Sequence, residues 1–369
     1  MSLLRQSRRE WLLRLMLVAG SLVVSLLLFE AILRLWAPGD NLRVTATADF
    51  FRPDDTRGFA LQANLERAIY WHGQRVEIIT NAAGRRVPGD PSFVEIRDRR
   101  QLLLIGDSYV FGMEENADDS FVNLLREHSN YDAINLGTPA YGTRMELDSL
   151  QEFVESEGHS LVDFALLFFF VGNDFTDNIL PMSFYSTDEN GRILRDGKND
   201  RLLMRKLVYS SHALSFLYLR IKPLINQLKY RNAGASTARA YSPSFYTTEV
   251  MEANREALSS FRDYVDSLGI PFGVVVIPHK DQLYKNFDSE ADRLRPNRMA
   301  IDLLQELSIP YLDLLPHFER RRSESIYNMI PTGHFSVNGH KIVAELVMDF
   351  VNQSGSRVSA DSAGTSEEF

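Results

Sequence analysis

Apolar runs and helical periods alternate along most of the chain. Three short runs are almost wholly apolar, as in strands buried on both faces of a parallel sheet: 102–105, 164–171 and 272–277. Two weaker runs, 132–136 and 309–314, indicate further strands. Between them, helical spacing covers 120–127, 144–157, 248–268, a stretch after Arg295-Pro296 to Leu307, and 338–351. This alternation predicts an α/β fold, a parallel sheet flanked by helices.

The amino-terminal residues depart from this pattern. Leu15 to Phe29 is an uncharged, mostly apolar run of 15 residues. Arg14 and Arg34 flank the run and lie 20 residues apart, which in a helix is about 30 Å, one hydrocarbon thickness. Trp11 and Trp36 lie just outside these arginines, where interface aromatics belong. We therefore expect a transmembrane helix at 11–36.

Basic residues on one side of this helix predict its orientation. A tail at 1–10 carries Arg5, Arg8 and Arg9, which favours a cytoplasmic amino terminus and an extracytoplasmic main domain. The alternative is a cleaved signal peptide. Signal peptides are cleaved after a small-residue A-x-A pattern close to the apolar run. The nearby A-x-A pattern is Ala46-Thr47-Ala48, which lies far beyond the run, so an uncleaved anchor is the preferred interpretation.

The rest of the chain divides by pattern into four parts. Residues 37–100 are expected to be a membrane-proximal segment with short strands, and 101–352 the α/β domain. An insertion at about 182–245 is polar at first and then helical in period, and it either borders the functional site or forms a peripheral helical hairpin. Residues 353–369 are rich in Ser, Gly and acidic residues, which predicts a disordered tail.

Composition excludes several classes of function. The net charge of -9 over 369 residues argues against a nucleic-acid binder, so no nucleic-acid partner is expected. The chain has no cysteine, which excludes disulfides, thiolate metal sites and a cysteine nucleophile. No cluster of His, Asp and Glu has metal-ligand spacing, and neither a metal nor a cofactor is expected.

Candidate chemistry begins at Gly106-Asp107-Ser108, directly after the apolar run 102–105. A serine on such a turn lies at the carboxyl edge of the sheet, where open α/β sheets bind their ligands. A serine hydroxyl becomes a useful nucleophile only when a base can take its proton. Taken alone, the tripeptide is a weak signal and is better explained as an Asp/Ser helix cap.

Three later blocks also follow predicted strands or precede the last helix: Asn135-Leu136-Gly137, Gly172-Asn173-Asp174 and Gly333-His334. With Gly106-Asp107-Ser108, and in this order, the blocks resemble the SGNH (GDSL-type) hydrolase superfamily. The resemblance covers roughly 101–350 without the insertion, and implies that the parallel sheet is flavodoxin-like and flanked by helices. It extends to a membrane-anchored bacterial envelope subgroup. That subgroup has an Asn-x-x-Gly-x-Arg stretch before the first strand, to which 81–86 is similar.

The resemblance implies a role for each block. Ser108 would be the nucleophile and His334 the general base. The oxyanion hole would be formed by the N–H groups of Ser108 and Gly137 and the side-chain amide of Asn173. Lys280, in a loop after the 272–277 strand, is either a contact for an anionic substrate or a solvated lysine.

One position departs from the family pattern. Family members carry an aspartate two or three residues before the histidine, which orients the imidazole. Thr332 and Pro331 stand at those positions here. His334 is therefore oriented by a backbone carbonyl in a Ser-His dyad, or by an acid from elsewhere such as Asp281 or Asp313, or the site is degenerate. His340, six residues later, is expected to be a structural histidine on a helix face.

The resemblance implies a serine-dependent hydrolase of a small acyl ester, with O-acetyl groups of an envelope or exported polysaccharide as the expected substrate. The expected location is the inner membrane, single-pass, with a periplasmic catalytic domain. One alternative is a polysaccharide O-acyltransferase of the same fold, supplied by a membrane partner. The other is a non-catalytic glycan-binding or assembly factor with a degenerate site.

Overall fold

The computed structural model describes residues 2–36, 50–71, 74–89, 99–180, 184–187, 193–195, 211–218, 221, 240–328 and 333–364. The chain forms two compact units, which are considered separately below. The anchor unit comprises 1–46, 69–75 and 199–229, and the α/β unit comprises 47–68, 76–198 and 230–369.

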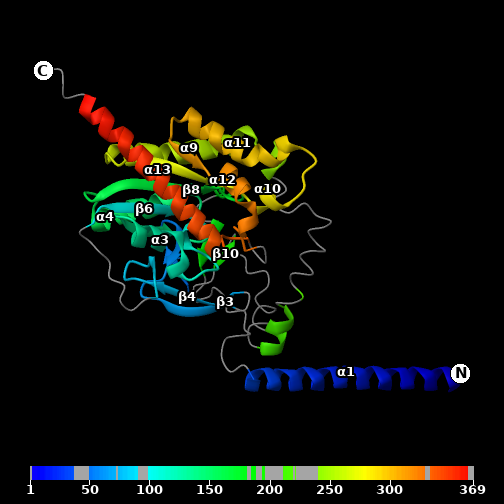
Figure 1. The fold of residues 1–369 in the computed structure, drawn as a ribbon. Coiled ribbons are helices and arrows are strands. Elements are labelled where there is room, and N and C mark those ends of the chain that lie inside the picture. The colour runs from blue at the N-terminus through cyan, green and yellow to red at the C-terminus, as the bar shows by residue number, and fades with distance from the viewer. Residues whose placement is uncertain are drawn as a thin grey trace. The chain divides into compact units, whose positions relative to one another are not determined.

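A five-stranded parallel sheet forms the centre of the α/β unit (Figure 1). Its strands are β6 (Gln101–Gly106), β7 (Asp132–Gly137), β8 (Val162–Phe170), β11 (Phe272–Ile277) and β12 (Tyr311–Asp313). They lie in the order β12-β11-β8-β6-β7, with every neighbouring pair parallel. This is the flavodoxin-like order, and it confirms the predicted fold class. The strand order reverses beside β6, so the switch point lies between β6 and β8.

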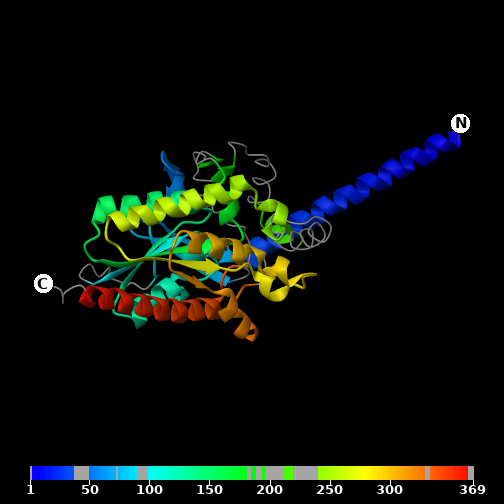
Figure 2. The same cartoon turned by 90° about the horizontal axis from the view of Figure 1, so that it is seen from above.

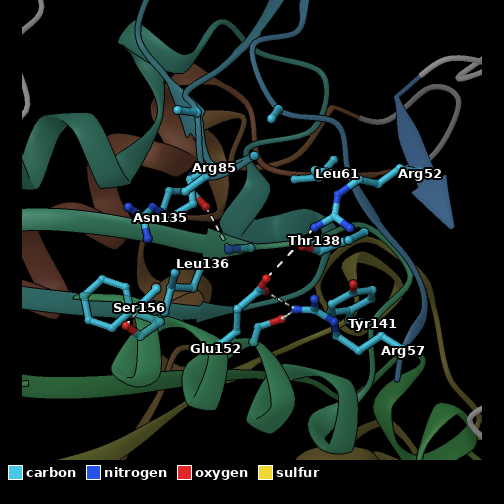
Figure 3. Close-up of a pocket in the computed structure, with 18 residues that line it drawn as sticks. Arg52, Arg57, Leu61, Arg85, Asn135, Leu136, Thr138, Tyr141, Glu152 and Ser156 are labelled. Carbon is cyan, nitrogen blue, oxygen red and sulfur yellow. Dashed lines mark hydrogen bonds and ion pairs between the residues drawn. The ribbon is translucent and has the colours of Figure 1, made fainter. Parts of the chain in front are cut away.

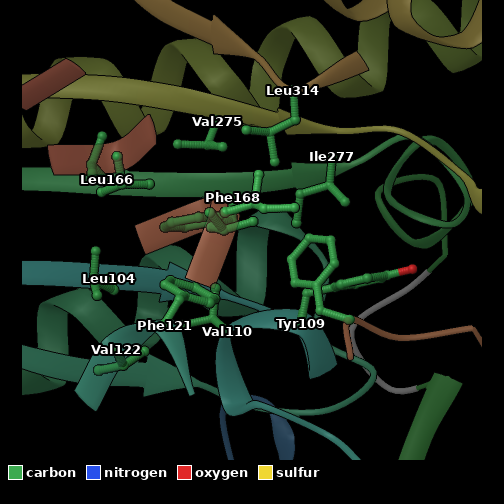
Figure 4. Close-up of a cluster of buried hydrophobic side chains, with 14 of the residues drawn as sticks. Leu104, Tyr109, Val110, Phe121, Val122, Leu166, Phe168, Val275, Ile277 and Leu314 are labelled. Atoms are coloured by element: carbon green, nitrogen blue, oxygen red, sulfur yellow. The ribbon is translucent and has the colours of Figure 1, made fainter. Parts of the chain in front are cut away.

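Alternate strand residues face opposite sides of the sheet, and helices cover both sides (Figure 2). On one side, Leu104, Phe168 and Val275 from neighbouring strands belong to one apolar cluster (Figure 4). The helices with residues in that cluster are α3 (Phe121–His128), α12 (Leu315–Arg320) and α13 (Val337–Gly364). The opposite cluster contains residues of α4 (Thr143–Glu157), α9 (Thr248–Ser267) and α11 (Glu290–Glu306). The wholly apolar runs of the sequence are therefore strands buried on both faces.

Short antiparallel strands surround this sheet. A hairpin pairs β1 (Phe51–Asp54) with β2 (Gly58–Leu61), and a second hairpin pairs β9 (Tyr185–Thr187) with β10 (Ile193–Arg195). A three-stranded sheet contains β3 (Glu66–Trp71), β4 (Gln74–Thr80) and β5 (Arg86–Val87). The short strands expected in the membrane-proximal segment are thus present, and the first part of the insertion also forms strands.

A cavity of about 260 Å³ lies where β2, the turn at 82–85 and α4 meet the end of β7 (Figure 3). The Arg57 guanidinium at this junction donates to Asp54 and Glu152, each at 2.7 Å, and to the Ser149 hydroxyl at 3.2 Å. Arg85 forms a further ion pair with Glu157. These pairs neutralise the two arginines and tie the amino-terminal strands to α4.

The anchor unit contains α1 (Ser2–Trp36), whose segment Leu13–Leu35 is long and apolar enough to cross a membrane. This agrees with the span expected at 11–36. The helix begins within the basic tail, and the side chains of Arg5, Arg8, Arg9 and Trp36 lie outside the described part. Residues 212–218 of the insertion are also helical, as their period predicted.

Two helices differ from the prediction. The last helix, α13, continues to Gly364 through residues expected to be disordered. Residues 353–364 contain no proline, and extending an existing helix adds a hydrogen bond for each residue ordered.

Helix α11 begins at Glu290 and carries Pro296 inside it. Ion pairs of Arg293 with Glu290 and of Arg295 with Asp292 support its first turns.

Candidate active site

Ser108 lies at the carboxyl edge of the sheet, on the first turn after β6. Helix α2 (Ser108–Phe111) is a single turn, capped at its start by Asp107, whose carboxylate accepts from the Tyr109 N–H at 2.9 Å. Ser108 is partly exposed. The turn lies beside the switch point of the sheet, where ligands bind in this class of fold.

Ser108, His334 and Glu114 form a hydrogen-bonded chain. His334 Nε2 lies 2.8 Å from Ser108 Oγ, and His334 Nδ1 lies 3.0 Å from Glu114 Oε1. A carboxylate can only accept, so Nδ1 carries the proton and Nε2 accepts from the serine hydroxyl. The Glu114 side chain is 1% exposed and that of His334 is 15% exposed, which shields their contact from water. The structure thus brings the two predicted residues together and supplies an acid that the sequence did not indicate.

An abrupt end to α2 brings Glu114 back toward His334. Gly112 has φ 76°, the left-handed conformation that closes a helix, and its N–H donates to the carbonyls of Ser108 and Tyr109. Glu114 itself has φ 81°, a conformation that non-glycine residues seldom adopt. The chain therefore reverses within six residues of the serine, and this backbone is strained at its acidic residue.

Arg86 holds this strained loop in place. Its buried guanidinium donates to the carbonyl oxygens of Phe111 at 2.8 Å, of Glu115 at 2.5 Å, and of Gly112. It also lies over the Phe111 ring, 4.8 Å from the centroid. Burial lowers the pKa of Arg86 to about 9, which leaves it charged at neutral pH. Arg86 is the arginine of the Asn-x-x-Gly-x-Arg stretch, whose asparagine, Asn81, accepts from two N–H groups of the turn.

Aromatic and aliphatic groups also pack around His334 and the residue before it. The Tyr109 hydroxyl donates to the Gly333 carbonyl at 3.0 Å, and its ring lies 5.0 Å from that of His334. Gly333 has φ 90°, and a Cβ there would lie 2.4 Å from Lys280 Cδ. Lys280 therefore packs against the residue before the histidine, and burial lowers the pKa of its ammonium.

The two further oxyanion donors that were expected are engaged elsewhere. The Gly137 N–H donates to Asn135 Oδ1 at 2.9 Å (Figure 3). A Cβ on Gly137 would lie 2.3 Å from the Phe111 nitrogen, so this glycine serves the close packing of β7 against α2. The Asn173 amide donates to Asp107 at 3.2 Å and to Asp177 at 2.9 Å. Asn173 is therefore beside the serine turn, with both of its N–H groups used.

A group of buried carboxyl groups lies behind the serine turn. Asp107, Glu146 and Asp174 are all buried, and both Glu146 oxygens lack a hydrogen-bond partner. Burial raises the pKa of each of the three carboxyl groups. Repulsion from Asp107 and Asp177 raises the pKa of Glu146 further. Among the described residues, no group of three or more His, Asp or Glu is arranged to hold a metal.

Replacing Glu146 by glutamine should stabilise the protein increasingly as pH rises. The folded pKa of Glu146 lies well above its ordinary value of 4.5, so above pH 4.5 the unfolded chain loses a proton that the folded chain retains. Wild-type stability then falls as pH rises, by up to about 1.4 kcal/mol per pH unit, until pH passes the folded pKa. Chemical denaturation of the full chain in detergent at three pH values between 5 and 8 measures the difference. Glu155→Gln, exposed on the same helix, is the control, and parallel curves for Glu146→Gln and wild type would contradict the prediction.

The acids proposed from sequence do not reach His334. Asp313 accepts from Asn297 Nδ2 at 2.7 Å and from the Leu315 N–H at 3.0 Å, so its carboxylate is engaged at the start of α12. Asp281 lies 3.6 Å from Lys285 Nζ and 3.9 Å from His279 Nδ1. Neither aspartate is the residue beside His334 Nδ1, because that nitrogen contacts the Glu114 carboxylate. The contact differs from the carbonyl-oriented dyad and fits the other expectation, an acid from elsewhere in the chain. Thr332 and Pro331 lie outside the described residues.

His340 is structural, as expected. It is buried, and its Nδ1 accepts from the Phe121 N–H at 3.2 Å. Burial lowers its pKa to about 3, so the ring is neutral at physiological pH. Sequence analysis allowed for an acid from elsewhere in the chain but did not name Glu114. Its position six residues after the serine was the signal that could have indicated it.

No protein-family model and no curated protein matches the sequence. Among solved structures, the chain is similar to a protein from Desulfitobacterium hafniense DCB-2 assigned to the lipolytic G-D-S-L family, at 12% identity and TM-score 0.39, over 68% of this chain and 99% of that one. It is also similar to a lipase/acylhydrolase from Enterococcus faecalis, at 14% identity and TM-score 0.39. That match covers 70% of this chain and 96% of the other. A third similar structure is an acetyl xylan esterase, at 10% identity and TM-score 0.38. That match covers 68% of this chain and 98% of the other. Roles for residues of this chain rest on its own geometry.

Proposed function

We propose that the α/β unit is an acyl-ester hydrolase of the SGNH (GDSL-type) class. Ser108 is its nucleophile, His334 its general base and Glu114 the acid that orients the imidazole. The observation that carries this proposal is the hydrogen-bonded chain from Ser108 Oγ through His334 to Glu114 Oε1, at 2.8 and 3.0 Å. The nucleophile, base and orienting group are the three parts of a serine-hydrolase triad.

The chemistry follows from the proton positions. Ser108 Oγ attacks the ester carbonyl carbon while its proton moves to His334 Nε2, and the Glu114 carboxylate stabilises the resulting imidazolium. The bond to the leaving alcohol then breaks as Nε2 returns the proton to the alcohol oxygen. A water molecule, deprotonated by the same nitrogen, attacks the acyl-serine, releases the acid and restores the serine hydroxyl.

The developing oxyanion needs donors at the start of α2. The Ser108 N–H, in the first residue of α2, is one such donor in this proposal. Asn173 becomes a second when an oxyanion replaces Asp107 or Asp177 as the acceptor of one of its two N–H groups. The Gly137 N–H donates to Asn135, so Gly137 is not an oxyanion donor in this proposal.

The proposed substrate is a small acyl ester, in particular an O-acetyl group on an envelope or exported polysaccharide. Support comes from the resemblance of the four sequence blocks and from the apolar helix Leu13–Leu35, which suits an enzyme anchored in the inner membrane with a periplasmic domain. Lys280, packed beside Gly333, is the proposed contact for an anionic part of the substrate. An acyltransferase would use the same acyl-serine and differ in the acceptor.

The wild-type protein should hydrolyse 4-nitrophenyl acetate and incorporate a serine-directed fluorophosphonate at Ser108. The activated serine attacks phosphorus as it attacks an ester carbonyl, and peptide mapping by mass spectrometry locates the adduct. Release of acetate from an acetylated polysaccharide tests the substrate class, and acetyl transfer to added glycan with little hydrolysis would favour the acyltransferase. A protein that is folded but neither labels nor hydrolyses either ester would favour a non-catalytic glycan-binding factor.

A further inference from the structure

Glu30 is an acidic residue inside the apolar segment Leu13–Leu35. Its carboxylate accepts from the Ser211 hydroxyl and the Ala213 N–H, each at 2.7 Å, and from the His212 N–H at 3.2 Å. These three donors stand at the start of the 212–218 helix, which Glu30 therefore caps. A carboxylate in a membrane span is costly unless it is paired, and here the second helix supplies the partners.

Apolar packing accompanies this cap. The Phe29 and Phe216 rings meet edge to face at 5.5 Å. Leu33, one turn beyond Phe29, is 5% exposed, whereas most of the large apolar side chains along α1 are exposed. Arg34 adds an ion pair to Glu30 at 2.7 Å. Residues more than 175 positions apart thus form one small helix pair at the end of the apolar segment.

The depth of the contact follows from helix geometry. Glu30 lies 17 residues after Leu13, which corresponds to about 26 Å along an α-helix. The hydrocarbon layer is about 30 Å thick, so a span that begins at Leu13 places Glu30 at the far edge of the layer. Whatever packs against Glu30 lies at the same depth.

The outer face of the second helix has the residues that such a depth favours. Leu217, Tyr218 and Ile221 are 37%, 38% and 46% exposed within the described part of the chain. These three side chains lie at the carboxyl end of the 212–218 helix or just beyond it. Aliphatic side chains next to a tyrosine are typical of the boundary between lipid tails and headgroups.

We propose that residues 211–218 form a membrane-contacting helix, docked on a retained α1 through Glu30, with Leu217 and Ile221 in the lipid boundary. Cleavage of α1 as a signal peptide would remove Glu30 and leave the Ser211, His212 and Ala213 donors without their acceptor. The helix of the insertion is thus a second membrane contact of the protein. This inference is independent of the proposed catalytic activity.

The absence of cysteine allows a direct test with single labels. Leu217→Cys and Ile221→Cys, each carrying the fluorophore NBD, are compared with Ser260→Cys, an exposed position on α9. The full-length protein is reconstituted in phosphatidylethanolamine/phosphatidylglycerol vesicles. The NBD emission from positions 217 and 221 should be blue-shifted relative to the emission from position 260. Nitroxide lipids should quench it several-fold more strongly than they quench the emission from position 260. Strong quenching by aqueous iodide, equal to that at 260, would overturn the membrane contact.

Glu30→Ala tests the docking contact. In this variant, nitroxide lipids should quench the labels at 217 and 221 less and aqueous iodide should quench them more, because the cap that holds the helix is lost. Glu10→Ala, at an exposed position on α1, is the control and should leave the quenching unchanged. Unchanged lipid quenching in Glu30→Ala would overturn the role of Glu30. Intact-mass measurement of the membrane-fraction protein should include α1, and a mature protein without it would overturn the retained anchor.

Discussion

Replacing Ser108 or His334 by alanine is expected to reduce kcat for ester hydrolysis by roughly 10⁴-fold or more, as for serine hydrolases whose nucleophile or base is removed. The two residues share one proton through the 2.8 Å contact between Oγ and Nε2, so either change removes the same reaction path. The double variant should then be little worse than either single variant. Steady-state kinetics with 4-nitrophenyl acetate, together with fluorophosphonate labelling, measures both effects.

The control for this prediction is His128→Ala, an exposed histidine on α3, which should retain wild-type kinetics. Circular dichroism and unfolding midpoints establish that each variant is folded. Full activity in folded Ser108→Ala would rule out this nucleophile. If the fold-reductions in kcat of Ser108→Ala and His334→Ala multiply in the double variant, the two side chains act separately.

Glu114→Gln should lower kcat by about 10³–10⁴-fold with a small change in KM, the effect expected when an orienting carboxylate becomes an amide. The contact of Glu114 Oε1 with His334 Nδ1 at 3.0 Å fixes the proton on Nδ1 and leaves Nε2 free to accept. A glutamine nitrogen facing Nδ1 would favour the opposite tautomer, with the proton on the nitrogen that must act as base. Because the group acts on His334 and not on the substrate, the loss should appear in kcat.

Glu115→Gln is the matched control. Glu115 is the next residue and is also buried, but its carboxylate accepts from Asn328 at 2.9 Å. It should therefore keep near wild-type kcat. Thr332→Asp, which restores an acid at the family position, should recover part of the activity in the Glu114→Gln background. Wild-type kcat in Glu114→Gln would contradict the triad and favour a Ser-His dyad.

The fold was largely predictable because its signals are local. The runs at 102–105 and 272–277 are apolar enough to be strands buried on both faces, and they are β6 and β11. Helical periods between them predicted α4 and α9, and the alternation predicted parallel pairing. Helix ends were less predictable: an acidic first turn allowed α11 to start before Pro296, and an existing helix continued through the tail after 352.

The candidate site was predictable only in part. Ser108 follows a buried strand directly, and His334 precedes the last helix, so both were expected at the same sheet edge; their 2.8 Å contact is consistent with this. Gly137 occupies the sequence position of an oxyanion donor, yet its N–H is turned to Asn135. The direction of one N–H depends on side-chain packing around β7, which the residue type does not encode.

The sequence by itself determined the order of strands and helices and the apolar amino-terminal helix, because each depends on residues close together in the chain. It predicted Ser108 and His334 as a pair only through the resemblance of the ordered sequence blocks, because the two residues lie 226 positions apart. Only the tertiary structure decided that the Glu114 carboxylate lies beside His334 Nδ1. That contact joins residues 220 positions apart. It also depends on a left-handed backbone at Glu114 that Arg86, from a third segment, holds through backbone carbonyls. Such a contact arises from the summed packing of three distant segments, and no local pattern of residues specifies it.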